Sequence, residues 1–239
     1  MKKLYTTLFL LLLTAPILTE TVLLKGGLVH SGNGGTAIIQ DILISDNTIV
    51  GVGNNLIIDG NTRVIEVNGL PVTPGLISPM SNLGIVEINS LDVTRDDESE
   101  ILSAGFSIFN AFNPHSTGIP WNRSNGVTSA ISTPSESSFP IFGLGSHFIL
   151  DGSLEIKGSK DIAMFGRLGA SYGSRAETLS LIESLLEIGK MVNSMPVEEI
   201  LELNIADQLE LQAQDIIALG KVVNCLLYTS DAADERHCV

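Results

Sequence analysis

The sequence predicts two parts of different fold class, a small amino-terminal β domain over residues 20–73 and an α/β region over residues 74–224. The first part is a series of short apolar runs separated by turn residues, which is typical of strands. The second part mixes β-branched runs with two stretches of helical periodicity. At 239 residues and 44% hydrophobic composition, the chain is long and apolar enough to bury a core.

The charge of the chain argues against polyanionic partners. The formal net charge is −14, and no cluster of Lys or Arg follows Lys2-Lys3. Attraction to nucleic acid phosphates or to anionic membrane surfaces therefore finds no support. A small-molecule partner remains compatible with this composition.

Residues 1–19 resemble a secretory signal peptide. Lys2-Lys3 is followed by an apolar run from Leu8 that continues to Leu18, which is shorter than the about 20 residues of a membrane span. We expect an exported protein, periplasmic or secreted, with no stable membrane span after signal removal. No Ala-x-Ala precedes Glu20, so retention by an uncleaved amino-terminal anchor is the alternative.

The β domain is predicted to be antiparallel. Strands at 41–45 and 48–52 flank Asp46-Asn47, whose residue types tolerate the positive φ of a tight hairpin turn. A further strand over Val64–Val67 ends at the turn Asn68-Gly69.

The α/β region is predicted to begin with a strand within Val72–Gly84, followed by a short helix at 119–123 and strands at 127–132 and 147–150. Apolar spacing of three and four predicts a helix over Ser174–Val192. A second helix is expected over Val197–Leu219, with Pro196 at its start. Lys221-Val222-Val223 then looks like the next strand.

The order of these elements resembles the exported, imidazolonepropionase-like members of the amidohydrolase superfamily. The resemblance rests on segments spread over residues 21–224, and those that matter most are Leu24–Gly27, Asp41–Ile44, Ile49–Gly53, Val72–Leu76, Ala111–Ser116 and Asn125–Ala130. It implies a small β-sandwich followed by the first part of a truncated (β/α)8 TIM-type barrel. The alternative is a generic β-sandwich binding module.

The resemblance also implies a divalent metal such as zinc, which activates water to hydrolyse a carbon–nitrogen bond. In the family, the first barrel strand ends in His-x-His, and here Met80 and Asn82 occupy those two places. A thioether and an amide are poor zinc ligands. Further family ligands lie on later strands, mostly beyond Asn224, so no metal ligand or cofactor is assignable in this chain.

Active sites in such barrels lie at the carboxyl ends of the strands. The expected substrate contacts are therefore Ser81 and Asn82 after the first strand, and Ser132 and Thr133 after the second. His115, in a loop that reaches the barrel mouth, is a further candidate. His30 and His147 are expected to be structural residues of strands.

Two other motifs have a plain explanation. The acidic run around Asp92 and Arg95–Glu100 lacks the spacing of an EF-hand, and a solvated face is expected in place of a calcium site. Gly143-Leu144-Gly145-Ser146 lacks the lysine of a phosphate-binding loop, and a tight turn explains its glycines.

The carboxyl end interrupts the pattern. Residues 225–239 resemble translated sequencing adapter, which predicts that the natural sequence departs near Asn224. A genuine polar tail is the alternative. Only in that case would a Cys225–Cys238 disulfide be expected of an exported protein.

Taken together, the expected protein is a fragment of an amidohydrolase-type parent that hydrolyses a non-peptide amide or cyclic amide. The fragment itself is expected to be inactive. Two alternatives are a non-catalytic scaffold that keeps the fold as a binding protein, and a partner-binding role for the β domain alone.

Overall fold

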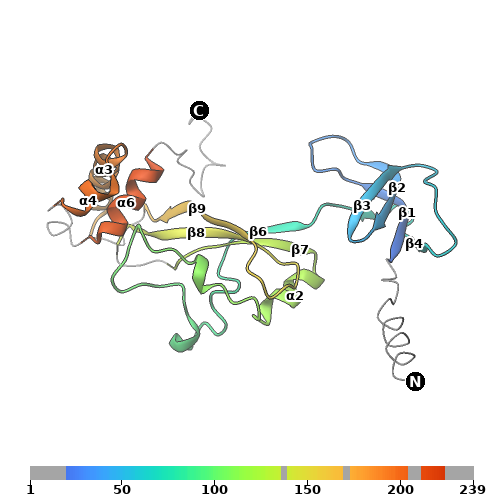
Figure 1. The fold of residues 1–239 in the computed structure, drawn as a ribbon, viewed down its shortest axis with the longest axis horizontal. Coiled ribbons are helices and arrows are strands. Elements are labelled where there is room, and N and C mark those ends of the chain that lie inside the picture. The colour runs from blue at the N-terminus through green and yellow to red at the C-terminus, as the bar shows by residue number, and fades with distance from the viewer. Residues whose placement is uncertain (1–19, 136–138, 169–172, 204–210, 224–239) are drawn as a thin grey trace, which may run out of the picture. The chain divides into compact units, whose positions relative to one another are not determined.

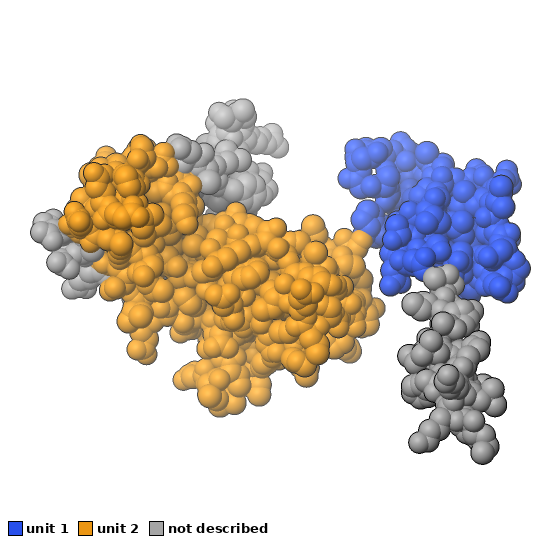
Figure 2. Space-filling view, viewed as in Figure 1, with its two compact units in different colours: residues 1–74 blue, residues 75–239 orange. Residues whose placement is uncertain are grey.

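In a computed structural model, the chain is described over residues 20–135, 139–168, 173–203 and 211–223. The predicted signal peptide and the predicted non-native tail lie outside these residues. The chain divides into two compact units, residues 1–74 and 75–239 (Figure 2).

The first unit is built on one five-stranded sheet (Figure 1). Its strand order is β3-β2-β1-β4, and the short β5 also pairs with β1. The strands are β1 (Thr21–Val29), β2 (Ile38–Ser45), β3 (Thr48–Gly53), β4 (Arg63–Glu66) and β5 (Pro71–Val72).

The predicted hairpin at Asp46-Asn47 is confirmed. The two residues have φ of 50° and 59°, and they join β2 to an antiparallel β3. Both residues adopt the left-handed conformation that Asn and Asp tolerate best among residues with a side chain. The local turn chemistry was therefore sufficient to predict this element.

The prediction of an antiparallel first domain holds for β1, β2 and β3 but was wrong for β4 and β5. Strands β4 and β5 run parallel to β1, because residues 54–62 carry the chain from β3, at one edge, to the other side of β1. Gly26-Gly27 lies inside β1. The register shifts between Leu24 and Gly27, and Gly26, at φ 67°, lets β1 continue through a bulge.

The second sheet that a β-sandwich requires is not formed by the described residues of the first unit, whose strands all belong to the one sheet. The β-sandwich stays a prediction.

The second unit contains a four-stranded sheet in the order β6-β7-β8-β9. The strands are β6 (Leu76–Ser81), β7 (Val127–Ser132), β8 (Ile141–Ile149) and β9 (Gly158–Gly166). Strands β6 and β7 are parallel, as a barrel predicts. Strand β8, however, runs antiparallel to β7, and β9 antiparallel to β8, so the expected run of parallel strands does not continue past β7.

Gly143–Ser146 lies inside β8, which corrects the expectation of a tight turn. A Cβ at Gly145 would lie 2.4 Å from the ring of Phe165 on the neighbouring β9. The glycine therefore makes room for an aromatic ring packed across the strand pair.

Two helices match their predictions. Helix α2 (Gly118–Ser124) lies beside β7, and α3 (Arg175–Val192) begins at a capping box. There, the Ser174 hydroxyl accepts from the Glu177 backbone N–H at 3.2 Å, and the Glu177 carboxylate accepts from the Ser174 backbone N–H at 2.6 Å. This reciprocal pair is a strong local start signal.

The predicted helix over Val197–Leu219 was wrong as a single element. The chain forms α4 (Val197–Leu201), leaves the helix by Leu203, and forms α6 (Ala213–Val222) later. The predicted strand at residues 221–223 was also wrong, because Lys221 and Val222 end α6. Short 3-10 turns, η1 (Asp92–Thr94) and η2 (Phe109–Ala111), complete the elements of the described chain.

The second unit has two hydrophobic clusters. One lies where α3, α4 and α6 gather at one end of β8 and β9 (Figure 1), and it includes Leu185, Ile200, Ile216 and Ile141. The other holds Phe148 of β8 stacked on Phe112 with ring centroids 3.9 Å apart, next to Ile85 and Ile119. This second cluster fixes the loops around the end of β6.

Candidate functional site

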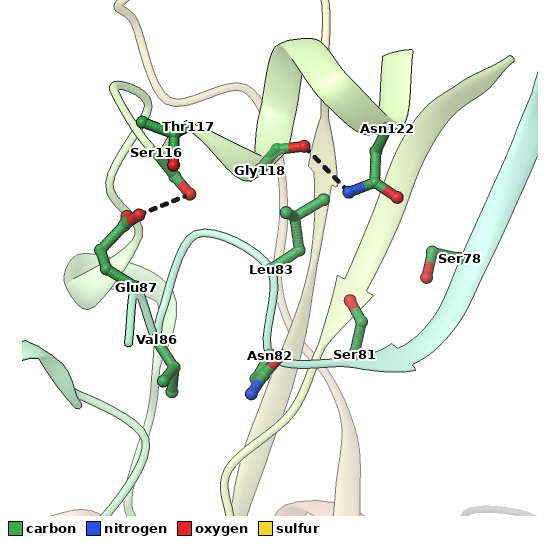
Figure 3. Close-up of a pocket in the computed structure, with 10 residues that line it drawn as sticks. All are labelled: Ser78, Ser81, Asn82, Leu83, Val86, Glu87, Ser116, Thr117, Gly118 and Asn122. Carbon is green, nitrogen blue, oxygen red and sulfur yellow. Dashed lines mark hydrogen bonds between the residues drawn. The ribbon is translucent and has the colours of Figure 1, made fainter. Parts of the chain in front are cut away.

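A pocket of about 270 Å³ opens beside the carboxyl end of β6 (Figure 3). Figure 3 shows Ser81 and Asn122 facing the same space from β6 and α2. Most of its lining is polar, and the residues come from β6, from the loop after it and from the segment that starts α2: Ser78, Ser81, Asn82, Leu83, Val86, Glu87, Ser116, Thr117, Gly118 and Asn122.

The ends of the two parallel strands are tied together at this pocket. Ser81 pairs with Ser132 in the sheet register, and the Thr133 backbone N–H donates to the Ser81 carbonyl at 2.8 Å. The fully buried Ser132 hydroxyl donates to the Leu83 carbonyl at 2.7 Å. Ser132 and Thr133 thus position the residues of the pocket, while Ser81 and Asn82 line it.

Glu87 lines the pocket and joins two segments. Its carboxylate accepts from the Asn113 amide at 2.9 Å and from the Ser116 hydroxyl at 3.1 Å. His115 lies between these partners, is exposed, and donates its backbone N–H to Asn113 Oδ1 at 2.9 Å. The structure places the neighbouring Ser116, and not His115, in the pocket lining.

Two amides complete the polar wall. Asn122 donates an N–H from its Nδ2 to the Gly118 carbonyl at 2.9 Å. Because a carbonyl can only accept, this bond fixes the orientation of the amide, and Asn122 Oδ1 takes no part in it. Asn82 donates to Asn89 Oδ1 at 3.3 Å.

Sequence reasoning singled out neither Glu87 nor Asn122 as a site residue. Their approach to Ser81 depends on the loop after β6 and on α2, and sequence spacing alone does not predict that proximity.

Met80 does not belong to the pocket lining. Between Ser78 and Ser81, β6 has one residue more than the matching part of β7, from Ala130 to Ser132. Met80 takes up this irregularity with φ 52° and a 63% exposed side chain. Of the two residues Met80 and Asn82, Asn82 lines the pocket and Met80 does not.

The described residues do not fit a divalent metal at this strand. A thioether and an amide are the only donors at the two family positions, and both are poor ligands for zinc. Within the part of the chain that the structure describes, no group of three or more His, Cys, Asp or Glu side chains is placed to hold a metal ion.

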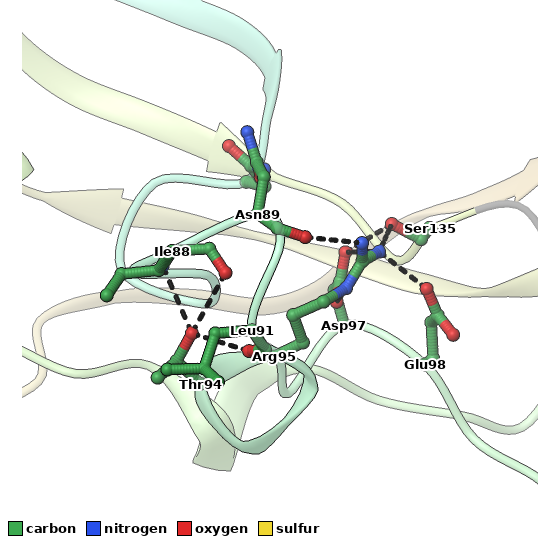
Figure 4. Close-up of polar contacts among 9 residues, drawn as sticks. Ile88, Asn89, Leu91, Thr94, Arg95, Asp97, Glu98 and Ser135 are labelled. Atoms are coloured by element: carbon green, nitrogen blue, oxygen red, sulfur yellow. Dashed lines mark hydrogen bonds and ion pairs between the residues drawn. The ribbon is translucent and has the colours of Figure 1, made fainter.

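The acidic run after β6 was expected to be a solvated face, and this was wrong for Asp97. Its side chain is only 1% exposed and receives Arg95 Nε and Nη2, both at 3.3 Å (Figure 4). The Ser135 hydroxyl donates to the same carboxylate, and Arg95 also pairs with the exposed Glu98 at 2.5 Å. The cluster ties the loop after β6 to the segment after β7.

The other histidines considered in the sequence, His30 and His147, are not among the residues that line the pocket. His30 is exposed just after β1, and His147 lies within β8 opposite Ile131 of β7.

None of the described helices is both long and apolar enough to span a membrane.

Comparison with known proteins supports the fold. No protein-family model and no curated protein matches the chain. Among solved structures, an amidohydrolase from Thermotoga maritima MSB8 superposes with a TM-score of 0.60 at 20% identity, covering 84% of this chain and 55% of that one. A second amidohydrolase matches 28% of this chain and 16% of its own, at 29% identity and a TM-score of 0.26.

The first match shows a shared fold over most of the chain. The chain spans only about half the length of the Thermotoga amidohydrolase, at 55%. At 20% identity the likeness extends to the fold and not to the chemistry of the site.

Proposed function

We propose that this chain is the amino-terminal part of an amidohydrolase-type protein whose full length hydrolyses a carbon–nitrogen bond other than a peptide bond. The observation that supports this most directly is the superposition with the Thermotoga amidohydrolase over 84% of the chain. A polar pocket beside the end of β6 is compatible with it, since substrate sites of barrel enzymes lie at strand ends. The class of substrate is an amide or cyclic amide of small size, and the proposed setting is outside the cytoplasm after export.

In this proposal, the described residues contribute substrate contacts. Ser81 and Asn82 offer hydrogen bonds from the strand end, and Glu87 and Asn122 offer them from the opposite wall. Ser132 and Thr133 act as positioning residues through the Leu83 and Ser81 carbonyls. The catalytic centre would have to come from residues other than Met80 and Asn82, and the chain by itself is expected to be inactive.

The test is an assay of the full-length protein. Purified protein would be incubated with N-acyl amino acids and cyclic amides, with zinc or manganese added. Hydrolysis that is lost on chelation and restored by metal supports the proposal. A folded, full-length protein that turns over none of these substrates would contradict it.

A second candidate is a non-catalytic member of this fold that binds a small molecule without hydrolysing it. Met80 and Asn82 favour it, because an enzyme of this type would be expected to keep strong ligands on its first strand. Ligand binding without turnover, together with no retained metal in the full-length protein, would distinguish this scaffold from the hydrolase.

A further inference from the structure

The pocket beside β6 has unused hydrogen-bonding capacity. Ser81 Oγ is buried and has no hydrogen-bond partner, although a buried hydroxyl without a partner is costly. Asn122 Oδ1 is left over once Nδ2 has donated to Gly118, and the structure gives it no partner among the described residues. Each Glu87 oxygen has accepted one hydrogen bond and can accept another.

These unused groups are mainly acceptors. The amide and carboxylate oxygens can only accept, while Ser81 can accept or donate. A ligand rich in acceptors, such as a carboxylate or phosphate, would leave Asn122 Oδ1 and Glu87 unsatisfied. A ligand that carries N–H donors matches the hydrogen-bonding character of all three groups.

The charge of the pocket also favours a ligand with N–H donors. Glu87 is the single ionisable group among the ten lining residues, and the lining contains no Lys, Arg or His. An anion placed here would face a carboxylate with no compensating cation in the wall, which costs free energy, whereas a cation gains a charge-assisted hydrogen bond. The small volume, about 270 Å³, suits a group of a few heavy atoms.

We propose that the pocket formed by Ser81, Glu87, Ser116 and Asn122 binds a small organic cation that carries N–H donors, an ammonium or guanidinium group. Glu87 is its counter-ion, and Ser81 Oγ and Asn122 Oδ1 accept further N–H bonds. The inference deepens the proposed function, because it names the charged end of the substrate that this wall would hold. It concerns binding alone and requires no hydrolysis.

The test uses the whole chain, labelled with 15N, at about 0.15 M salt so that long-range attraction is screened. The probes are n-propylammonium, methylguanidinium, neutral n-propanol and propionate. Saturable shifts of the Ser81, Asn82, Ser116 and Asn122 resonances with either cation, and none with propanol or propionate, support the proposal. Shifts with propionate, or no saturable shift with either cation, overturn it.

Matched variants separate the pocket from the overall negative charge. Glu87→Gln keeps the shape of the side chain and is expected to weaken cation binding about tenfold or more, the loss of a charge-assisted hydrogen bond. Glu187→Gln, on the exposed face of α3, removes the same charge elsewhere and should leave binding unchanged. Equal weakening by both variants overturns the proposal.

Ser81→Ala is a second variant, needed if Glu87→Gln disturbs the loop after β6. The spectrum of the 15N-labelled variant shows whether that loop keeps its structure. Ser81→Ala should weaken binding about threefold or more, since one neutral hydrogen bond is lost. Unchanged binding in Ser81→Ala would remove Ser81 from the site. Failure of the cation to bind refutes this inference while the hydrolysis assay above still stands, so the two proposals fail separately.

Discussion

At the scale of single residues, polar side chains hold the loops around the pocket. Ser132 holds the Leu83 carbonyl, Glu87 holds Asn113 and Ser116, and Asp97 holds Arg95 and Ser135. Except for the contact between Asp97 and Arg95, which are two residues apart, each bond joins segments that are far apart in the sequence. The position of the pocket walls therefore depends on a few side chains whose partners leave no local signal.

Asp97 is expected to be the most sensitive of these residues. Asp97→Ala removes the partner of Arg95, which is 26% exposed, and leaves the Ser135 hydroxyl without its acceptor. We expect a loss of about 2–4 kcal/mol in the free energy of unfolding, below the 3–5 of fully buried pairs because Arg95 retains some solvent. Urea unfolding followed by circular dichroism measures it.

Glu98→Ala is the matched control, because Glu98 pairs with the same guanidinium but is 59% exposed. An exposed ion pair contributes about 0–1 kcal/mol. Equal losses in the two variants would show that burial of Asp97 does not govern the cluster.

At the scale of elements, helix α6 is fixed by a carboxylate that serves two purposes. Asp215 is 1% exposed; it accepts from its own helix start at Gln212 and from the backbone N–H groups of Ser103 and Gly105, at 2.7–2.8 Å. Helix capping and loop anchoring thus share one side chain. Gly105 is needed for the close approach, because a Cβ there would lie 2.6 Å from the Gln214 backbone.

Asp215→Ala should lower the free energy of unfolding by about 3 kcal/mol, because three backbone N–H donors lose their acceptor, the buried Asp215 carboxylate. Glu177→Ala is the control at the same helical position of α3, where the exposed carboxylate caps only its own helix. It should cost about 1 kcal/mol. Similar values from thermal and urea unfolding of both variants would argue that the loop contacts of Asp215 contribute little.

Elements with local signals could be predicted, and those fixed by distant contacts could not. The Asp46-Asn47 turn and the apolar spacing over Ser174–Val192 are local signals, so the hairpin and helix α3 followed from the sequence, and the structure adds the capping box at Ser174 and Glu177. The parallel pairing of β4 with β1 depends on where residues 54–62 take the chain. Lys221-Val222-Val223 has strand composition, yet tertiary packing of Ile216 and Leu219 keeps α6 helical to Val222.

The candidate site could be predicted only in part for the same reason. Ser81 and Asn82 follow from the rule that sites lie at strand ends, and both line the pocket. Glu87, Ser116 and Asn122 reach it through loop and helix placement. Met80 lies at an irregularity in β6 and is not part of the pocket lining. No residue type in this segment predicts the irregularity.

At the scale of the whole molecule, the first unit exposes much apolar surface for its size. Side chains on β2, β3 and the following loop are about half exposed or more: Ile38 57%, Ile39 59%, Ile49 61%, Val50 57% and Ile57 94%. Its buried hydrophobic side chains among the described residues are Leu23 and Ile42. An exposed apolar surface of this kind favours association with another protein surface or aggregation.

Residues 20–74 expressed alone are therefore expected to self-associate. Size-exclusion chromatography with light scattering should show oligomers or aggregate across a range of concentrations. Replacing Ile49 and Val50 by Thr, which keeps strand propensity but reduces apolar area, should shift the fragment toward the monomer. A monomeric, cooperatively folding wild-type fragment would contradict this account of the first unit.

At the scale of the whole chain, the end of β6 carries a polar pocket, and the described residues place no group of three or more His, Cys, Asp or Glu side chains to hold a metal ion. The most direct measurement is a zinc titration of the purified chain, followed by isothermal calorimetry and compared with Asn82→Ala. We predict that the variant binds zinc no differently from the parent chain, since Met80 is not part of the pocket lining and Asn82 is a poor ligand. A stoichiometric zinc site that Asn82→Ala abolishes would contradict the central claim.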